Sequence, residues 1–166
     1  DLHSFPTRRS SDLRTSQRAQ TMGRRELSTM LEDFESKARD VVTSRGARVV
    51  KTIGDAVMYI SDDLTIAADV VTALVAELQS GPETMRVRAS LVEGRVVSRS
   101  GDVFGPTVNL ASRLVDTAEP GGICMDEPTA RALQDTPASS LYRVRRCHEV
   151  VAKGLGSITP WSLERA

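Results

Sequence analysis

The sequence predicts a single α+β domain in which one β-sheet carries helices on its face. Amphipathic helical patterns alternate along the chain with short β-rich runs, and a tight turn joins two of these runs, which implies antiparallel pairing. The 166 residues are enough for one domain with a real hydrophobic core, but not comfortably for two.

The first expected element is a long amphipathic helix that begins near Arg24 and ends at Gly46. Its apolar residues follow the i, i+3, i+4, i+7 spacing of one helix face, and charged residues lie between them. These apolar residues are Leu27, Met30, Leu31, Phe34, Ala38, Val41 and Val42. A glycine directly after the last of them is a common helix end.

A β-hairpin is expected over residues 47–60, where two β-rich runs flank Gly54 and Asp55. Both faces of this hairpin are largely apolar. Helices can cover one face, and the other face needs a partner subunit or a bound ligand as its cover.

A second helix is expected to run from a cap at Asp62 or Asp63 to about Gln79, with Gly81 and Pro82 as its stop. The rest of the chain continues the alternation of strands and helices. We expect a strand at 86–98, a loop at 100–102, a helix at 106–115, a strand at 123–125, a helix at 127–133, and final strands at 141–151 and 160–163.

The composition excludes several classes of protein. Lys and Arg (22 residues) balance Asp and Glu (22 residues), so the basic surface of a general nucleic-acid binder is absent. No apolar run approaches the ~20 residues that span a bilayer, which argues against a membrane segment in this chain. Two cysteines, Cys124 and Cys147, lack metal-ligand spacing, so we expect reduced thiols in a cytoplasmic protein.

The tip of the expected hairpin, Lys51-Thr-Ile-Gly-Asp55, is the first candidate for chemistry. Asp55 is either a turn residue or a ligand for a divalent metal, because Mg²⁺ prefers one or two carboxylates together with phosphate oxygens. Lys51 lies among apolar residues in the middle of a strand, and is either an edge lysine that reaches water or a binding residue.

The second candidate is the segment Gly101-Asp-Val-Phe-Gly-Pro-Thr-Val-Asn-Leu-Ala-Ser-Arg113. Asn109 and Arg113 are four residues apart, so a helix that begins near Pro106 presents both on one face. A guanidinium can hold phosphate oxygens while the amide fixes a sugar oxygen. Asp102, on the loop before the helix, is either a capping acid or an acceptor for an exocyclic amine.

The two segments together resemble the catalytic domain of class III nucleotidyl cyclases. The resemblance is carried by Arg48-Val-Val-Lys-Thr-Ile-Gly-Asp-Ala-Val-Met58 and by the segment from Gly101 to Leu114, and it extends from about Arg24 to Leu163. It implies a ferredoxin-like α+β fold and a head-to-tail homodimer with active sites at the interface, where a partner would cover the second hairpin face.

The resemblance implies that Lys51 and Asp102 contact the purine, in the pairing of adenylate cyclases. Adenine offers an amine donor that suits a carboxylate and a ring nitrogen that suits an ammonium, whereas guanine presents the reverse polarity. We therefore expect ATP as substrate and 3′,5′-cyclic AMP with pyrophosphate as products.

The resemblance also implies roles at the ribose and the phosphates. Asn109 would orient the ribose, Arg113 would stabilise charge on the α-phosphate, and Lys153 would hold the terminal phosphates. Asp55 would be one of two metal-binding aspartates, with two Mg²⁺ or Mn²⁺ ions expected per site. Since Lys51 and Asp55 flank one hairpin tip, the two residues are expected to serve opposite sites of the dimer.

The first 13 residues depart from the family pattern. The family opens with a strand that carries the first metal aspartate, and here that place holds Phe5-Pro-Thr-Arg-Arg-Ser-Ser-Asp-Leu13. Pro6, Arg8 and Arg9 are unfavourable in a central strand. We therefore expect residues 1–13 to be non-native and 14–166 to form the catalytic domain, with the first strand replaced. Asp12 either takes the place of the missing ligand or leaves the site with one carboxylate.

Two alternatives to an active enzyme remain. A nucleotide-binding or dimerisation module with impaired catalysis is favoured if one metal aspartate is missing. An RNA binder of similar topology is disfavoured, because the chain holds only six aromatic residues, counting Phe, Trp and Tyr, for base stacking.

Overall fold

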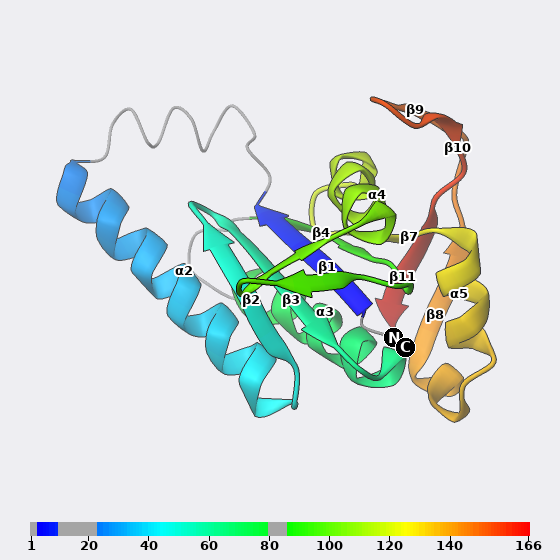
Figure 1. Ribbon diagram of the computed structural model, residues 1–166, viewed down its shortest axis with the longest axis horizontal. Helices are drawn as coiled ribbons and strands as arrows, with labels where there is room; N and C mark the ends of the chain where they lie inside the picture. The colour runs from blue at the N-terminus through cyan, green and yellow to red at the C-terminus, as the bar shows by residue number, and fades with distance from the viewer. Residues whose placement is uncertain (1–2, 10–22, 80–85) are drawn as a thin grey trace.

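The computed structural model describes residues 3–9, 23–79 and 86–166. Within them, a mixed seven-stranded sheet has the strand order β2-β3-β1-β4-β7-β11-β8, which confirms the predicted α+β class (Figure 1). Its strands are β1 His3–Arg9, β2 Arg48–Ile53, β3 Ala56–Ser61, β4 Val87–Leu91, β7 Ile123–Met125, β8 Tyr142–Arg146 and β11 Trp161–Arg165. Two hairpins stand outside this sheet: β5 Val97–Arg99 with β6 Asp102–Phe104, and β9 Val150–Ala152 with β10 Gly156–Ile158.

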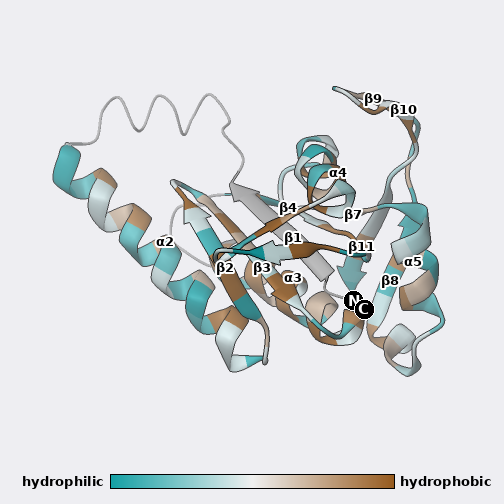
Figure 2. Ribbon diagram, in the orientation of Figure 1, coloured by the Kyte–Doolittle hydropathy of each residue, from teal (hydrophilic) through white to brown (hydrophobic). Residues whose placement is uncertain are grey.

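Helices α2 (Arg24–Ser44), α3 (Leu64–Gln79) and α5 (Glu127–Gln134) build the main core on one face of the sheet. Figure 2 shows hydrophilic residues along much of α2 and a more hydrophobic α3. The cap predicted at the start of α3 is confirmed, since Asp63 Oδ1 accepts hydrogen bonds from the backbone N–H groups of Thr65 and Ile66. The predicted stop at Gly81-Pro82 lies outside the described residues.

The opposite face of the sheet is covered by α4 (Pro106–Leu114) and the β5–β6 hairpin. Alternate residues of a strand point to opposite faces. Tyr59 accordingly packs in the main core, whereas Met58 and Ile60 pack with Val103 and Val108 in a second cluster. The second apolar face of the hairpin is thus covered largely by the chain itself, so the expectation that it needs a partner or a ligand is wrong for most of that face. The sequence predicted helices on one face of the sheet, whereas the structure also has α4 on the opposite face.

Strand β1 fills the centre of the sheet between β3 and β4. Residues 3–9 thus form a central strand of the sheet, although Pro6, Arg8 and Arg9 are unfavourable there. The register pairs Thr7 and Arg8 with both neighbouring strands, whereas Pro6 is paired with Met58 of β3 alone. A proline has no backbone N–H to donate to a second neighbouring strand. It is therefore tolerated at a position that pairs with one strand only. Asp12 lies outside the described residues.

The cysteines are free, as expected: Cys124 is buried in β7, where desolvation raises the pKa of its thiol to about 11, and Cys147 is half-buried. Among the described residues, we find no helix with the length and apolar character needed to span a bilayer.

Candidate active site

Lys51 and Asp102 form an ion pair between β2 and β6, with 3.0 Å between Lys51 Nζ and Asp102 Oδ2. The two side chains are 37% and 34% exposed, so the pair is open to a ligand from one side. Asp102 Oδ1 also accepts a 2.8 Å hydrogen bond from the backbone N–H of Val103. The hydrogen bond from Lys51, and then that from Val103, lower the pKa of the Asp102 carboxyl, which is therefore ionised at neutral pH.

A β-bulge places Lys51 beside Asp102. The β2–β3 register pairs Val49 with Tyr59 but Lys51 with Met58, because it shifts between Val49 and Lys51. Residues two apart in a regular strand share a face, and an inserted residue breaks this rule. Lys51 thus lies on the face covered by β6, while Val49 packs in the main core. Asp102 begins strand β6 instead of lying on the expected loop.

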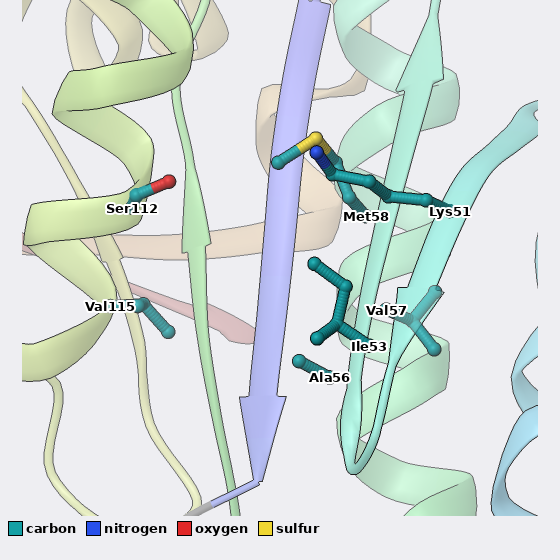
Figure 3. A pocket seen from close by; sticks show the side chains of 7 residues that line it. All are labelled: Lys51, Ile53, Ala56, Val57, Met58, Ser112 and Val115. Carbon is teal, nitrogen blue, oxygen red and sulfur yellow. The ribbon is translucent and has the colours of Figure 1, made fainter. Parts of the chain in front are cut away.

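A pocket of about 170 Å³ lies between the β2–β3 hairpin and α4, as Figure 3 shows. Among the lining side chains that the structure describes, all are apolar except those of Lys51 and Ser112. The lining residues are Lys51, Ile53, Ala56, Val57, Met58, Ser112 and Val115. A flat ring that enters this pocket would meet apolar side chains and Lys51, which is paired with Asp102.

Arg113 and Lys153 are brought together by the packing of the β9–β10 hairpin near α4. Arg113 Nη1 donates a 2.7 Å hydrogen bond to the backbone carbonyl oxygen of Lys153. Both side chains are exposed, so each cationic group is accessible to a ligand from solvent. Asn109 is also exposed, one turn before Arg113 on α4, which confirms that one helix carries both residues.

Asp55 is half-buried in the turn between β2 and β3, directly after Gly54, whose φ of 56° is a left-handed conformation that suits glycine. Over residues 23–79 and 86–166, no group of three or more His, Cys, Asp or Glu side chains gathers in a way that could hold a metal ion. A carboxylate such as that of Asp55 can share a Mg²⁺ or Mn²⁺ ion with substrate phosphates.

Several residues of the site were not predicted from the sequence. Ser112 and Met58 line the pocket, and Gly154 lies against Arg113. Ser90, in β4, donates a buried 2.7 Å hydrogen bond to the carbonyl of Ala111 and so ties α4 to the sheet. The spacing of Asn109 and Arg113 predicts α4 as a helix of the site, but it does not reveal these long-range contacts.

The chain also matches known proteins. The model of the adenylate and guanylate cyclase catalytic domain matches residues 11–165. The chain belongs to this family. It is 36% identical over 143 residues to an adenylate cyclase of Glutamicibacter nicotianae, covering 86% of this chain and 34% of that protein. It is 37% identical over 168 residues to an adenylate cyclase of Streptomyces coelicolor, covering 87% and 44%.

The cyclase domain thus spans less than half the length of these two curated relatives. Solved structures show the same fold at low sequence identity. One is the catalytic core of a rhodopsin-guanylyl cyclase with converted specificity, in complex with ATPαS. It has a TM-score of 0.84 at 19% identity, and the match covers 99% of this chain and 95% of that chain. The adenylyl cyclase CyaB of P. aeruginosa has a TM-score of 0.79 at 17% identity, with coverage of 99% and 94%.

Proposed function

We propose that this domain is an adenylate cyclase that converts ATP into 3′,5′-cyclic AMP and pyrophosphate in a homodimer. The observation that carries the proposal is the Lys51–Asp102 pair beside an apolar pocket. The ionised carboxylate can accept from the N6 amine of adenine, and the ammonium can donate to a ring nitrogen. Guanine reverses this polarity, so the pair favours ATP over GTP.

The phosphates and the ribose are assigned to α4 and the β9–β10 hairpin. Asn109 would hold the ribose, Arg113 would stabilise the charge that develops on the α-phosphate, and Lys153 would hold the terminal phosphates. The ribose 3′-oxygen attacks the α-phosphorus in line and its proton passes to water. A P–O bond forms to the 3′-oxygen, and the bond to pyrophosphate breaks. The exposed cations Arg113 and Lys153 support this assignment.

Asp55 would hold Mg²⁺ or Mn²⁺ together with the substrate phosphates, with two ions per site expected from the family resemblance. The metal would lower the pKa of the attacking hydroxyl and neutralise the leaving group. Since Lys51 is turned toward Asp102 while Asp55 lies at the hairpin tip, we assign Asp55 to the site of the partner protomer. Val97 and Phe104, cross-strand partners at 62% and 52% exposure, offer an apolar surface for this dimer.

Cyclic AMP formation from ATP with Mn²⁺ or Mg²⁺ tests this function. We expect product from the unchanged chain and none from Asp55→Ala or Arg113→Ala, with Asp33→Ala, an exposed position on α2, as the matched control. Absence of cyclic AMP from a folded, dimeric protein would contradict the proposal.

The second candidate function is a catalytically impaired module that binds ATP or dimerises. The observation that favours it is the departure of residues 1–13 from the family's first strand, which carries the first metal aspartate. Binding of ATP measured by calorimetry, without turnover, would decide for this candidate.

A further inference from the structure

The guanidinium of Arg113 lies directly on the turn between β9 and β10. Its Nη1 donates to the Lys153 carbonyl at 2.7 Å. The next residue, Gly154, has a φ of 80°, and a Cβ built on it would be 2.1 Å from Arg113 Nη1 and 2.6 Å from Cζ. The guanidinium thus occupies the space that any side chain at position 154 would fill.

The turn is itself fixed to α4. Ala152, at the end of β9, is buried, and Ile158 of β10 packs against the cluster that contains Ala111 and Leu114 of α4. The backbone N–H of Leu155 closes the turn on the Ala152 carbonyl at 3.0 Å. A long, exposed arginine side chain has many rotamers, and a fixed carbonyl acceptor restricts them.

We propose that the Lys153 carbonyl and Gly154 position the Arg113 guanidinium for the substrate phosphate, which makes Gly154 a positioning residue. This inference rests on the proposed cyclase function for its kinetic consequence. An arginine has five N–H donors, and the carbonyl occupies one of them, so the rest stay available for phosphate oxygens. The same hydrogen bond ties Arg113 to the backbone of Lys153, the second residue assigned to the triphosphate.

Gly154→Ala tests the proposal, with Gly156→Ala as its matched control. Gly156 lies in the same hairpin at a φ of 73°, but a Cβ built there meets no atom within 4 Å. Both variants therefore carry similar backbone strain, and only the first displaces the guanidinium. Because the displaced atoms are the far end of a flexible side chain, Gly154→Ala is expected to fold, and equal thermal unfolding midpoints of the two variants would establish a matched pair.

We expect Gly154→Ala to lower kcat by about 100-fold, the order of loss that a misplaced catalytic group causes, while KM for ATP changes little. Gly156→Ala is expected to keep a kcat close to that of the unchanged chain. Because Arg113→Ala is expected to make no product, the double-mutant cycle uses Arg113→Lys, whose side chain ends in a smaller ammonium group. Adding Gly154→Ala to Arg113→Lys should cost much less than Gly154→Ala costs alone. Equal losses in the two glycine variants, or additive losses in the cycle, would overturn the proposal.

A second readout needs no turnover. Nuclear magnetic resonance relaxation of the Arg113 Nε–Hε group should report an ordered side chain in the unchanged chain and in Gly156→Ala, and a mobile one in Gly154→Ala. If the chain makes no cyclic AMP, the proposed function fails. The relaxation measurement still shows whether Gly154 positions the Arg113 side chain. An Arg113 side chain that is equally mobile in all three proteins would overturn the positioning role.

Discussion

Val49 and Lys51 lie on opposite faces of the sheet although they are two residues apart in one strand. The β-bulge between them leaves Val49 in the main core and turns Lys51 toward Asp102 on the other face. In a regular strand Lys51 would face the main core, as Val49 does. The single inserted residue turns Lys51 to the other face, where it can bind a ligand.

The first prediction concerns substrate choice. Asp102→Asn removes the charged acceptor of the adenine amine and leaves Lys51 without its ionic partner. A hydrogen bond to a charged group contributes about 1.5–3 kcal/mol, so kcat/KM for ATP should fall by roughly 10- to 150-fold. Kinetics with ATP and GTP, alongside the exposed control Asp33→Asn, check this expectation. An unchanged ratio of the two kcat/KM values would remove Asp102 from base recognition.

The second prediction concerns stability against pH. The hydrogen bond from Lys51 lowers the pKa of Asp102 in the folded protein. At pH values near the ordinary pKa of an aspartate, the unfolded chain therefore binds more protons than the folded chain. Stability supplied by the pair is then present above the unfolded pKa and is lost as pH falls through the lowered folded pKa. The difference in free energy of unfolding between the unchanged chain and Asp102→Asn should shrink on acidification, as urea titrations at several pH values would measure. A difference that grows in acid would contradict the ion pair.

The third prediction concerns β1. The strand pairs with β3 and β4, so a chain that lacks residues 1–9 exposes two unsatisfied strand edges in the middle of the sheet. We expect this variant to lose cooperative urea unfolding, followed by circular dichroism. Unfolding with an unchanged midpoint would instead support the sequence-based prediction that residues 1–13 are foreign to a domain formed by 14–166.

Local patterns predicted much of the fold. Helix α2, the β2–β3 hairpin, the cap of α3 and the start of α4 at Pro106 follow from periodicity, turn residues and capping, which act over a few positions. The bulge before Lys51, the central place of β1 and the position of α4 on the second face depend on pairing between distant segments. A sequence pattern does not encode these directly, and Asp102 was for this reason expected on a loop.

The candidate site was predicted in the same uneven way. The motifs identified Lys51 and Asp102, and the structure places them in contact. The contact between Arg113 and the Lys153–Gly154 turn was missed, because 40 residues separate Arg113 from Lys153 and each is polar and exposed. The roles of Asn109 and Asp55 stay predictions.

The central claim is that two copies of this chain gather one ATP between them, with Arg113 from one protomer and Asp55 from its partner. Mixing the Asp55→Ala and Arg113→Ala proteins under conditions of subunit exchange tests it most directly. Random pairing of a two-fold dimer should form heterodimers with one intact site each and restore about one quarter of the cyclic AMP formation of the unchanged chain. A mixture that stays inactive while heterodimers are detected would contradict the shared site.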